Sequence, residues 1–381
     1  MLPQKLIVIC TRNFANHTCN GKLQSPLMKT VLSGYNSYFP KIIDQSLEKV
    51  SFVYTPAMRE RIKKCSEYYT IGRNPVQGEF MVLAYEALNK DSMIDDEMIH
   101  KLQVIVTTVE MVQTYFFFWD DLEDKSMTRL GKPCWHLLED TGLFAFTDAC
   151  IMRSFINDII RQNFHGEMCA NILSVYDKVY FTSSVGQYME AAISRSRNYN
   201  NYTMESYTKI GNLRSSFYSV KSPLLLGLAL NNKLNKESYD VVDDVGLDIG
   251  VLVQCHNDLI DYFSEKGTLN IGKSGTDIQE GKFSWVATTF LENCNSEQKR
   301  IFAENYGSAD PDKVKRIIEL YEEVNVAQHY QLEQQKRFDI FNEKVSKLPK
   351  NATPSAEFFK SFQNLLHYYS QDTTNLMYDK H

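Results

Sequence analysis

Residues 100–119 read HKLQVIVTTVEMVQTYFFFW, and DDLED follows at 120–124. The first stretch is apolar on nearly every face and contains no helix breaker, which predicts a helix surrounded by other helices. Residues 241–263, VVDDVGLDIGVLVQCHNDLIDYF, also combine apolar runs with polar residues and end before Gly267. A third segment, FYSVKSPLLLGLAL at 217–230, contains Pro223, which should kink a helix because proline lacks a backbone donor. The sequence therefore predicts an all-α protein.

Length and composition agree with one large helical domain. The chain has 381 residues, of which 43% are hydrophobic and 23% charged, and it contains 17 Gly and 10 Pro. These values exclude a largely disordered chain and argue against a β-sandwich. We predict an N-terminal extension over residues 1–45 and a single all-α domain over residues 46–381.

Charge, cysteine pattern and targeting signals narrow the class of protein. The net charge of -6 offers no basic surface for nucleic acid. The eight cysteines form no CxxC pair, so neither a zinc site nor a disulfide framework is predicted. No apolar run reaches the roughly 18 residues of a membrane span. We expect a cytoplasmic protein; a mitochondrial location is the alternative, because no acidic residue precedes Asp44.

An acidic cluster follows the aromatic end of the first stretch directly. Its members are Asp120, Asp121, Glu123 and Asp124. Gly131 and Pro133 come next and would stop a helix, so the cluster should lie near a helix C-terminus. Carboxylates there meet the negative end of the helix dipole, which costs about 0.3–1 kcal/mol each. We therefore expect a cationic partner. The alternative for this cluster alone is a solvated helix end.

A second cluster ends the second apolar stretch. Its members are Asn257, Asp258, Asp261 and Glu265. Asn257, Asp261 and Glu265 are spaced i, i+4 and i+8, so their oxygens line one helix face. Oxygen ligands from two helices suit Mg²⁺, which completes its shell with water and substrate phosphate. Together the clusters predict a diphosphate held through metal ions; two unrelated surface clusters are the alternative.

A diphosphate site also requires cations, because the leaving group must be neutralised as its bond to carbon breaks. The candidates near the two clusters are Arg129, Arg214, Lys273 and Lys282. Each alone is more simply explained as a solvated charge. As a set beside two acidic clusters, they predict diphosphate binding.

The motifs, in this order, resemble those of trans-isoprenyl diphosphate synthases, most closely the farnesyl diphosphate synthase type, over roughly residues 55–367. FFFWDDLEDKSMTRLGKPCWH resembles the first aspartate-rich region, and QCHNDLIDYF followed by IGKSGTDIQEGKFSW resembles the second. SSVGQYMEAA resembles the GQxxD region, with Glu190 for its aspartate, and LRSSFYSVKSPLLL resembles the segment with a diphosphate-binding lysine. The resemblance implies the isoprenoid synthase fold, a single large helical bundle around a central cavity, in a homodimer.

The resemblance also implies a set of site residues for an allylic diphosphate and three Mg²⁺ ions, with Mn²⁺ as a substitute. The predicted metal ligands are Asp120, Asp121, Asp124, Asn257, Asp258, Asp261 and Glu265. The predicted diphosphate-binding residues are Arg129, Arg214, Lys273, Lys282 and Gln254. The predicted substrate pocket contains Tyr115, Phe116, Gln187, Ser215 and Ser219, of which the first two correspond to positions that control chain length. No catalytic base is identified.

The residues for a second substrate, isopentenyl diphosphate, depart from the family pattern. Asn74 and Gln77 stand where the family has a lysine and an arginine, with Arg73 as a partial replacement. The paired arginines after the first aspartate-rich motif are reduced to Arg129 and Leu130, and the basic tail is replaced by TTNLMYDKH. A pocket without these bidentate donors should bind a second diphosphate weakly.

The combination is similar to insect terpene synthases derived from the farnesyl diphosphate synthase family. Asn257, Asp261 and Glu265 also look somewhat like the NSE metal motif of terpene cyclases. We therefore predict Mg²⁺-dependent ionisation of one prenyl diphosphate, farnesyl diphosphate by preference, to a sesquiterpene hydrocarbon or alcohol with release of diphosphate. Two alternatives stay open. One is a prenyltransferase of the farnesyl diphosphate synthase type, which condenses isopentenyl diphosphate with an allylic diphosphate, and the other is a non-catalytic homologue.

Overall fold

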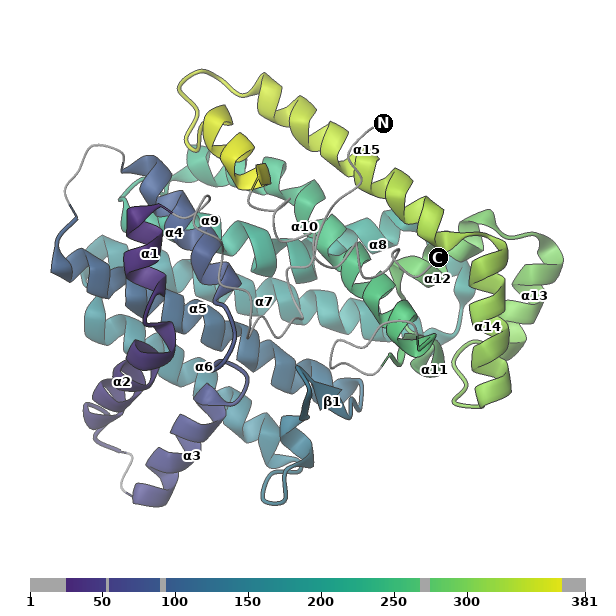
Figure 1. Ribbon diagram of the computed structural model, residues 1–381, viewed down its shortest axis with the longest axis horizontal. Coiled ribbons are helices and arrows are strands. Elements are labelled where there is room, and N and C mark those ends of the chain that lie inside the picture. Colours follow the sequence, from purple (N-terminus) through teal and green to yellow (C-terminus); the bar gives the residue numbers. More distant parts are fainter. Residues whose placement is uncertain (1–24, 53–54, 90–93, 268–274, 365–381) are drawn as a thin grey trace. The chain divides into compact units, whose positions relative to one another are not determined.

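The computed structural model describes residues 25–52, 55–89, 94–267 and 275–364 (Figure 1). Its α-helices are α1 (Pro26–Leu32), α2 (Tyr35–Glu48), α3 (Pro56–Glu67), α4 (Val76–Leu88), α5 (Asp96–Glu123), α6 (Phe144–Asn163), α7 (Gly166–Ser196), α8 (Met204–Gly211), α9 (Ser222–Leu230), α10 (Lys236–Glu265), α11 (Asp277–Glu280), α12 (Trp285–Asn293), α13 (Ser296–Asn305), α14 (Pro311–Glu323) and α15 (Val326–Lys347). The shorter elements are 3-10 helices η1 (Trp135–Leu137) and η2 (Tyr199–Asn201), π-helix η3 (Asn212–Lys221), and strands β1 (Thr128–Arg129) and β2 (Lys132–Pro133).

Within the described ranges, no helix combines the length with the apolarity that a membrane span requires. The all-α prediction is confirmed.

The chain divides into two compact units. The α5 unit comprises residues 12–177 and 222–239, and the α10 unit comprises residues 1–11, 178–221 and 240–381. The long helices α7 and α10 contribute residues to both units. The predicted division between residues 45 and 46 stays a prediction.

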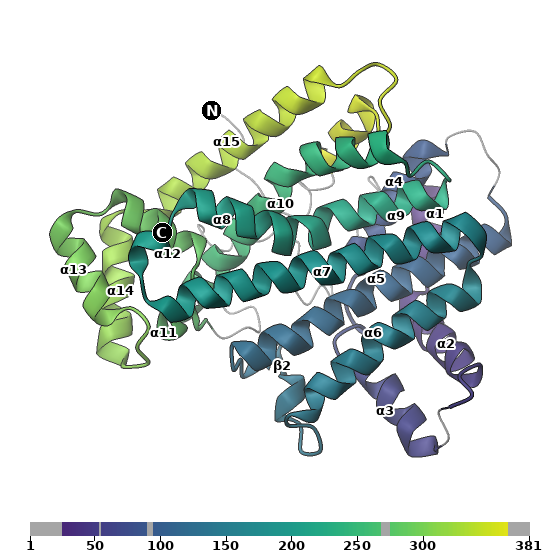
Figure 2. The ribbon, with the colours of Figure 1, turned by 180° about the vertical axis from the view of Figure 1, so that it is seen from behind.

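Helix α5 extends the predicted central helix at both ends. Asp95 caps its N-terminus by accepting the backbone N–H of Met98 at 2.8 Å. Buried side chains cover most faces between Leu102 and Phe118, as the apolar pattern predicts. Figure 2 shows α6 running beside α5, and the two helices pack against each other. Helix α4 packs against α5 and also against α9.

Aromatic packing fixes the chain just after α5. Trp135 stacks on Phe118 with ring centroids 5.1 Å apart, and its indole N–H donates to Asp148 at 2.8 Å. The hydroxyl of Tyr69 accepts the backbone N–H of Trp135 at 3.0 Å. Between these residues, β1 and β2 pair as a short antiparallel hairpin. The hairpin folds back onto the last turn of α5 and brings Arg129 with it.

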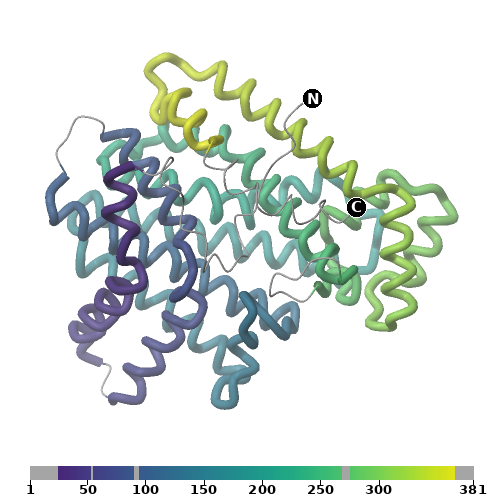
Figure 3. Tube along the Cα trace, in the orientation of Figure 1, coloured from purple at the N-terminus to yellow at the C-terminus, as the bar shows by residue number. Residues whose placement is uncertain are grey.

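The core of the C-terminal part of the α10 unit is aromatic. The ring of Phe302 stacks on Phe290 and on Tyr306, with centroids 5.1 Å and 4.3 Å away. Tyr321 meets Phe290 edge-on at 5.6 Å. The trace in Figure 3 follows α12, α13 and α14 as short helices, and α14 packs against both of the others. These rings hold the helices that follow the second acidic cluster.

The helix type changes next to Pro223, the residue for which the sequence predicts a kink. The π-helix η3 ends at Lys221, and α9 begins at Ser222 with Pro223 in its first turn, where a missing N–H costs little. Lys221 donates to Asn212 at 2.8 Å and to Asp243 at 2.7 Å, which ties the two ends of η3 together. Segments of π-helix often lie at functional sites.

Gly227 allows α9 to approach α4 closely. A Cβ atom at this position would lie 2.5 Å from the Ala84 Cβ and 2.9 Å from the Tyr85 backbone nitrogen. We expect Gly227→Ala to lower the free energy of unfolding by about 1–3 kcal/mol, as overpacking does. Gly211→Ala is the control, because its added Cβ would lie 3.6 Å from the nearest atom, on Val251. Equal urea denaturation midpoints for the two variants would contradict this packing.

Candidate functional site

The last turn of α5 carries the first acidic cluster, as predicted. Helix α5 ends at Glu123, and Asp124 donates its backbone N–H to the Asp120 carbonyl at 2.9 Å. Arg129, on β1, turns back to this helix end. Its Nε lies 2.9 Å from Asp121 Oδ1, and its Nη2 lies 2.6 Å from Asp120 Oδ2. The cation expected at the negative end of the helix dipole is therefore Arg129.

Asp121 and Arg129 form a buried ion pair. The second oxygen of Asp121, Oδ2, accepts a hydrogen bond from the Tyr69 hydroxyl at 3.0 Å. Arg129 is only 3% exposed, and its guanidinium carbon lies 4.6 Å from the centroid of the Phe117 ring. Burial lowers the pKa of Arg129, but Asp121 and then Asp120 raise it by more, so its pKa stands well above the usual value. Arg129 therefore remains charged.

Asp120 and Asp124 are more accessible than Asp121. Both are half-buried, and their i, i+4 spacing places them on one face of the helix end. Both carboxylate oxygens of Asp121, by contrast, accept hydrogen bonds within the protein. A Mg²⁺ ion that keeps water and substrate oxygens in its shell requires accessible carboxylates. Asp120 and Asp124 thus fit the predicted ligand role better, and Asp121 holds Arg129 in place.

Asp258, in the second cluster, is surrounded by donors. Its Oδ2 accepts hydrogen bonds from the Tyr207 hydroxyl at 2.8 Å and the Trp285 backbone N–H at 2.7 Å. Its Oδ1 accepts from the Gln254 side-chain amide at 2.8 Å. Burial, followed by the negative charge of Glu190, raises the pKa of Asp258 to about 6. This carboxylate joins α8 and the start of α12 to α10, so other groups already occupy the oxygens predicted to bind metal.

Asp261 and Glu265 hold the turn that begins α11. Asp261 Oδ1 accepts the backbone N–H groups of Thr276 and Asp277 at 3.0 Å and 2.9 Å. Glu265 Oε2 accepts the backbone N–H of Ile278 at 3.1 Å. Burial, followed by Asp261, raises the pKa of Glu265 to about 7. The two carboxylates share one helix face, as their spacing predicts, and one oxygen of each accepts backbone N–H groups.

Asn257 is the member of the second cluster least engaged by these contacts. It is half-buried on α10, one turn before Asp261. Among the described residues, no three His, Cys, Asp or Glu side chains are grouped as in a closed metal site. Among the predicted metal ligands, the half-buried oxygen donors include Asp120 and Asp124 in the α5 unit and, separately, Asn257 in the α10 unit. Such hard donors fit Mg²⁺, which uses few protein ligands when phosphate and water supply the rest.

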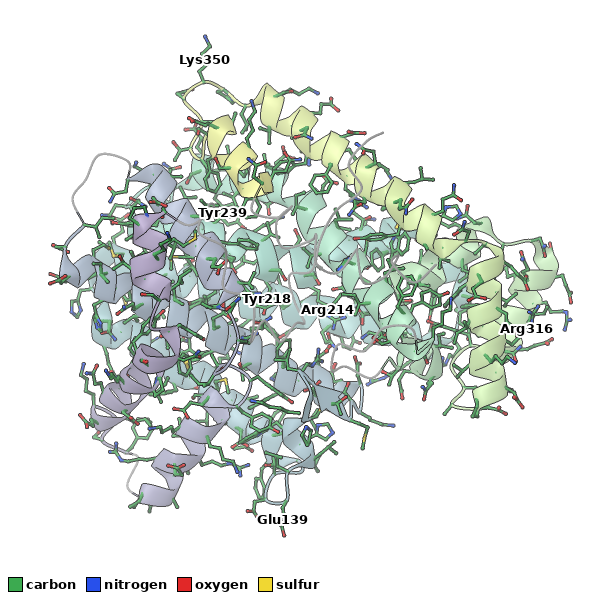
Figure 4. All side chains as sticks on the ribbon, viewed as in Figure 1. Glu139, Arg214, Tyr218, Tyr239, Arg316 and Lys350 are labelled. Atoms are coloured by element: carbon green, nitrogen blue, oxygen red, sulfur yellow. The ribbon has the colours of Figure 1, made fainter. Side chains whose placement is uncertain are left out.

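Two of the predicted cations lie around one carboxylate, Glu190. Arg214, on η3 and labelled in Figure 4, contacts Glu190 Oε2 through its Nη1. Lys282 Nζ lies 3.9 Å from Glu190 Oε1 and 3.6 Å from Asp277 Oδ1. Lys273 lies outside the described residues. The sequence had singled out Glu190 only as a replacement for an aspartate, because neither cation is near it along the chain.

The predicted pocket residues belong to both units. In the α5 unit, Tyr115 is buried on α5 and its ring centroid lies 4.9 Å from that of Phe116. Those in the α10 unit are Gln187 on α7 and Ser215 and Ser219 on η3. The Ser215 hydroxyl contacts the side-chain oxygen of Gln254, so both ends of this amide are engaged.

The segment that replaces the second diphosphate site is buried and paired internally. Arg73 is 9% exposed; its Nη2 lies 2.9 Å from Glu110 Oε2, and its Nη1 contacts Gln113 Oε1. Glu110 also accepts the backbone N–H of Gly78 at 3.2 Å. Gln77 is 0% exposed, and neither atom of its amide has a hydrogen-bond partner among the described residues. The cation that could have compensated for the lost lysine and arginine is therefore bound to Glu110.

The buried carboxyl group of Glu79, on α4, should make the stability of the folded protein depend on pH. Burial, followed by the charge of Glu110, raises the pKa of Glu79 to about 8, above the value of about 4.3 expected in the unfolded chain. The folded state therefore binds this proton more tightly, and the contribution of Glu79 to stability falls as the pH rises toward 8. We expect the stability of Glu79→Gln relative to the parent protein to increase by at least about 1 kcal/mol between roughly pH 5 and 8.

The measurement is urea denaturation at several pH values. Glu139→Gln, which changes an exposed carboxylate, is the control and should leave the pH profile unchanged. A constant stability difference between Glu79→Gln and the parent protein would mean that Glu79 titrates normally.

The chain is similar to a known family, to named relatives and to solved structures. The polyprenyl synthetase family matches residues 59–324. A chloroplastic bifunctional chrysanthemol synthase from Tanacetum cinerariifolium is 29% identical over 81% of this chain and 79% of its own length. A farnesyl pyrophosphate synthase from Nezara viridula is 29% identical over 75% of this chain and 71% of its own. Among solved structures, T. brucei farnesyl diphosphate synthase complexed with risedronate has a TM-score of 0.79 and 25% identity, covering 90% of this chain and 99% of that one.

The fold is the all-α isoprenoid synthase fold, which confirms the predicted fold class. The chain belongs to the polyprenyl synthetase family, because the family match spans most of its length. It is thus an enzyme of this family, and the resemblance inferred from the order of the motifs is confirmed.

Proposed function

We propose that this enzyme is a class I terpene synthase. In this proposal it ionises one prenyl diphosphate, farnesyl diphosphate by preference, and releases diphosphate and a sesquiterpene hydrocarbon or alcohol. The observation that carries the proposal is the burial of Arg73 against Glu110 and Gln113.

A second diphosphate would need cations that this segment does not offer. Arg73 is already neutralised by Glu110, Gln77 is uncharged, and Leu130 is a buried apolar side chain. Releasing Arg73 toward a ligand would leave Glu110 buried without its charge partner, which costs about 3–5 kcal/mol. This cost supports a reaction without isopentenyl diphosphate.

The predicted site residues have separate roles in this proposal. Asp120, Asp124 and Asn257 would hold the Mg²⁺ ions, three by resemblance and replaceable by Mn²⁺. Bound metal would supply positive charge where negative charge develops on the departing diphosphate. Asp121 positions Arg129, and Asp258 positions Gln254.

The remaining predicted residues would bind the two ends of the substrate. Arg129, Arg214, Lys273, Lys282 and Gln254 would bind the diphosphate. Tyr115 and Phe116 would border the hydrocarbon chain, where aromatic faces stabilise a carbocation by roughly 0.5–2 kcal/mol each. Gln187, Ser215 and Ser219 would complete the pocket. With no second substrate, an internal double bond, proton loss or water would end the reaction.

The names of the relatives support two functions. One relative is named a bifunctional chrysanthemol synthase and another a monoterpene synthase. Several others are named farnesyl pyrophosphate synthases, which favours condensation with isopentenyl diphosphate as the second candidate. The first candidate is supported by Arg73, because Glu110 and Gln113 already bind its guanidinium.

Product analysis tests the proposal directly. Purified protein with Mg²⁺ is incubated with farnesyl or geranyl diphosphate alone and then with isopentenyl diphosphate added. We expect hydrocarbons or alcohols in the first reaction and the same products in the second. A longer prenyl diphosphate as the sole product would establish the second candidate, and no product in either reaction would favour a non-catalytic homologue.

A homodimer is part of the proposal and has its own test. At the start of α6, Leu143 is 84% exposed and Phe144 is 67% exposed, and Phe146 beside them is also exposed. A second copy of the chain would cover such a patch. We expect a dimer in sedimentation equilibrium and a shift toward monomer for the double variant Leu143→Ser, Phe144→Ser. A dimer of unchanged affinity would exclude this patch from the dimer interface.

The cytoplasmic location and the lack of a nucleic-acid partner stay predictions.

A further inference from the structure

Glu190 lies between two cations from different parts of the chain. It is buried on α7, where its Oε2 contacts Arg214 of η3 and its Oε1 lies 3.9 Å from Lys282, which follows α11. Both cations are predicted to bind the diphosphate. In the absence of ligand, one protein carboxylate therefore takes the place of an anion between them.

The backbone around Glu190 is fixed on several sides. One turn earlier, a Cβ added to Gly186 would lie 3.0 Å from the Arg214 Cβ, so α7 and η3 are in close contact. One turn later, the Ser194 hydroxyl donates to the Glu190 carbonyl at 2.9 Å and accepts the Phe283 backbone N–H at 2.8 Å. The backbone that carries Glu190 is therefore held by packing against η3 and by the bridge through Ser194.

Both cations beside Glu190 are already paired with carboxylates. Arg214 and Lys282 carry the positive charges, and Asp277 lies 3.6 Å from Lys282 as a second carboxylate. The negative charge of Glu190 also contributes to the raised pKa of Asp258. A diphosphate that arrives alone would meet cations that are already neutralised and carboxylates that repel it.

We propose that Glu190 is an internal competitor for the diphosphate, which makes binding at Arg214 and Lys282 depend on a divalent cation. A metal ion brought in with the diphosphate offsets the repulsion from Glu190, whereas a metal-free diphosphate must displace the carboxylate unaided. Glu190 thereby selects the metal complex of a diphosphate over the free anion. This inference rests on the proposed function only in taking Arg214 and Lys282 as diphosphate-binding residues.

Isothermal titration calorimetry with inorganic pyrophosphate tests whether the Glu190 carboxylate competes with a diphosphate for the two cations. For the parent protein we expect weak binding in EDTA and much tighter binding in Mg²⁺. Glu190→Gln should tighten binding in EDTA by at least about tenfold and gain less in Mg²⁺, so the dependence on metal shrinks. Glu190→Ala removes the carboxylate without adding an amide and should give the same result.

The matched control is Glu333→Gln. Glu333 pairs with Arg337 at 2.7 Å in the same unit, at a place outside the cluster, so this variant should bind pyrophosphate as the parent protein does. Thermal unfolding gives a second measurement: pyrophosphate without metal should stabilise Glu190→Gln more than the parent protein.

The outcomes separate this inference from the proposed reaction. Unchanged metal dependence in both Glu190 variants would overturn the competitor while leaving the diphosphate site intact. No pyrophosphate binding by any variant in Mg²⁺ would overturn both. Condensation products together with the expected effect of Glu190→Gln would overturn only the proposed reaction.

Discussion

Changing both Asp120 and Asp124 to asparagine is expected to lower kcat with farnesyl diphosphate by at least about a thousandfold. The two carboxylates are half-buried on one face of the end of α5, and asparagine retains their shape but removes the charges that attract Mg²⁺. The fold should persist because Arg129 keeps its buried partner Asp121. Diphosphate release at saturating Mg²⁺ gives kcat, and thermal unfolding checks the fold.

Two further variants separate the loss of Asp120 and Asp124 from a general change in charge and from the loss of support for Arg129. Glu139→Gln changes an exposed carboxylate of the same unit, labelled in Figure 4, and should leave kcat unchanged. Asp121→Asn should lower both stability and kcat, because Asp121 supports Arg129 and Tyr69. Normal turnover by the double variant would remove Asp120 and Asp124 from the metal site.

Replacing Arg129 with methionine is expected to lower the free energy of unfolding by about 3–5 kcal/mol, the typical cost of breaking a buried ion pair. Arg129 bonds Asp121 and Asp120 at once, and Asp121 is fully buried. Methionine fills a similar volume but leaves the Asp121 charge without a cation. Urea denaturation measures the loss, and turnover by the folded fraction should also fall, since Arg129 is a predicted diphosphate-binding residue.

The control for this prediction is an exposed arginine. Arg316, also labelled in Figure 4, pairs with Glu319 and Glu323 on α14, and Arg316→Met should cost less than about 1 kcal/mol. Adding Asp121→Asn to Arg129→Met should restore part of the lost stability, because the unpaired charge is then removed. Equal losses for the two single arginine variants would contradict the buried pair.

The apolar pattern was sufficient to predict the helices that carry the site. Helices α5 and α10 contain the predicted segments 100–119 and 241–263, and each acidic cluster lies at the C-terminal end of its helix. The need for a cation beside the first cluster also followed from the sequence, since carboxylates at a helix C-terminus are unfavourable. These features depend on neighbours along the chain.

The partners of individual side chains could not be predicted in the same way. Asp120 and Asp121 are adjacent, yet the first is half-buried and the second is enclosed by Tyr69 and Arg129. The sequence marks Arg73 as a partial replacement for the lost cations, but it does not show that the guanidinium pairs with Glu110 in the interior. The π-helix η3 was also missed, because an apolar pattern does not report a change in hydrogen-bond spacing.

By itself, the sequence determined the helical class, the helix ends that carry the acidic clusters, and the family. The tertiary structure alone decided which carboxylates stay accessible and which are bound by donors, as Asp258 is by Tyr207 and Trp285. It alone placed Glu190 between Arg214 and Lys282. The physical reason is that successive helix positions differ by about 100° in direction, so the partner of each depends on an element distant in the chain.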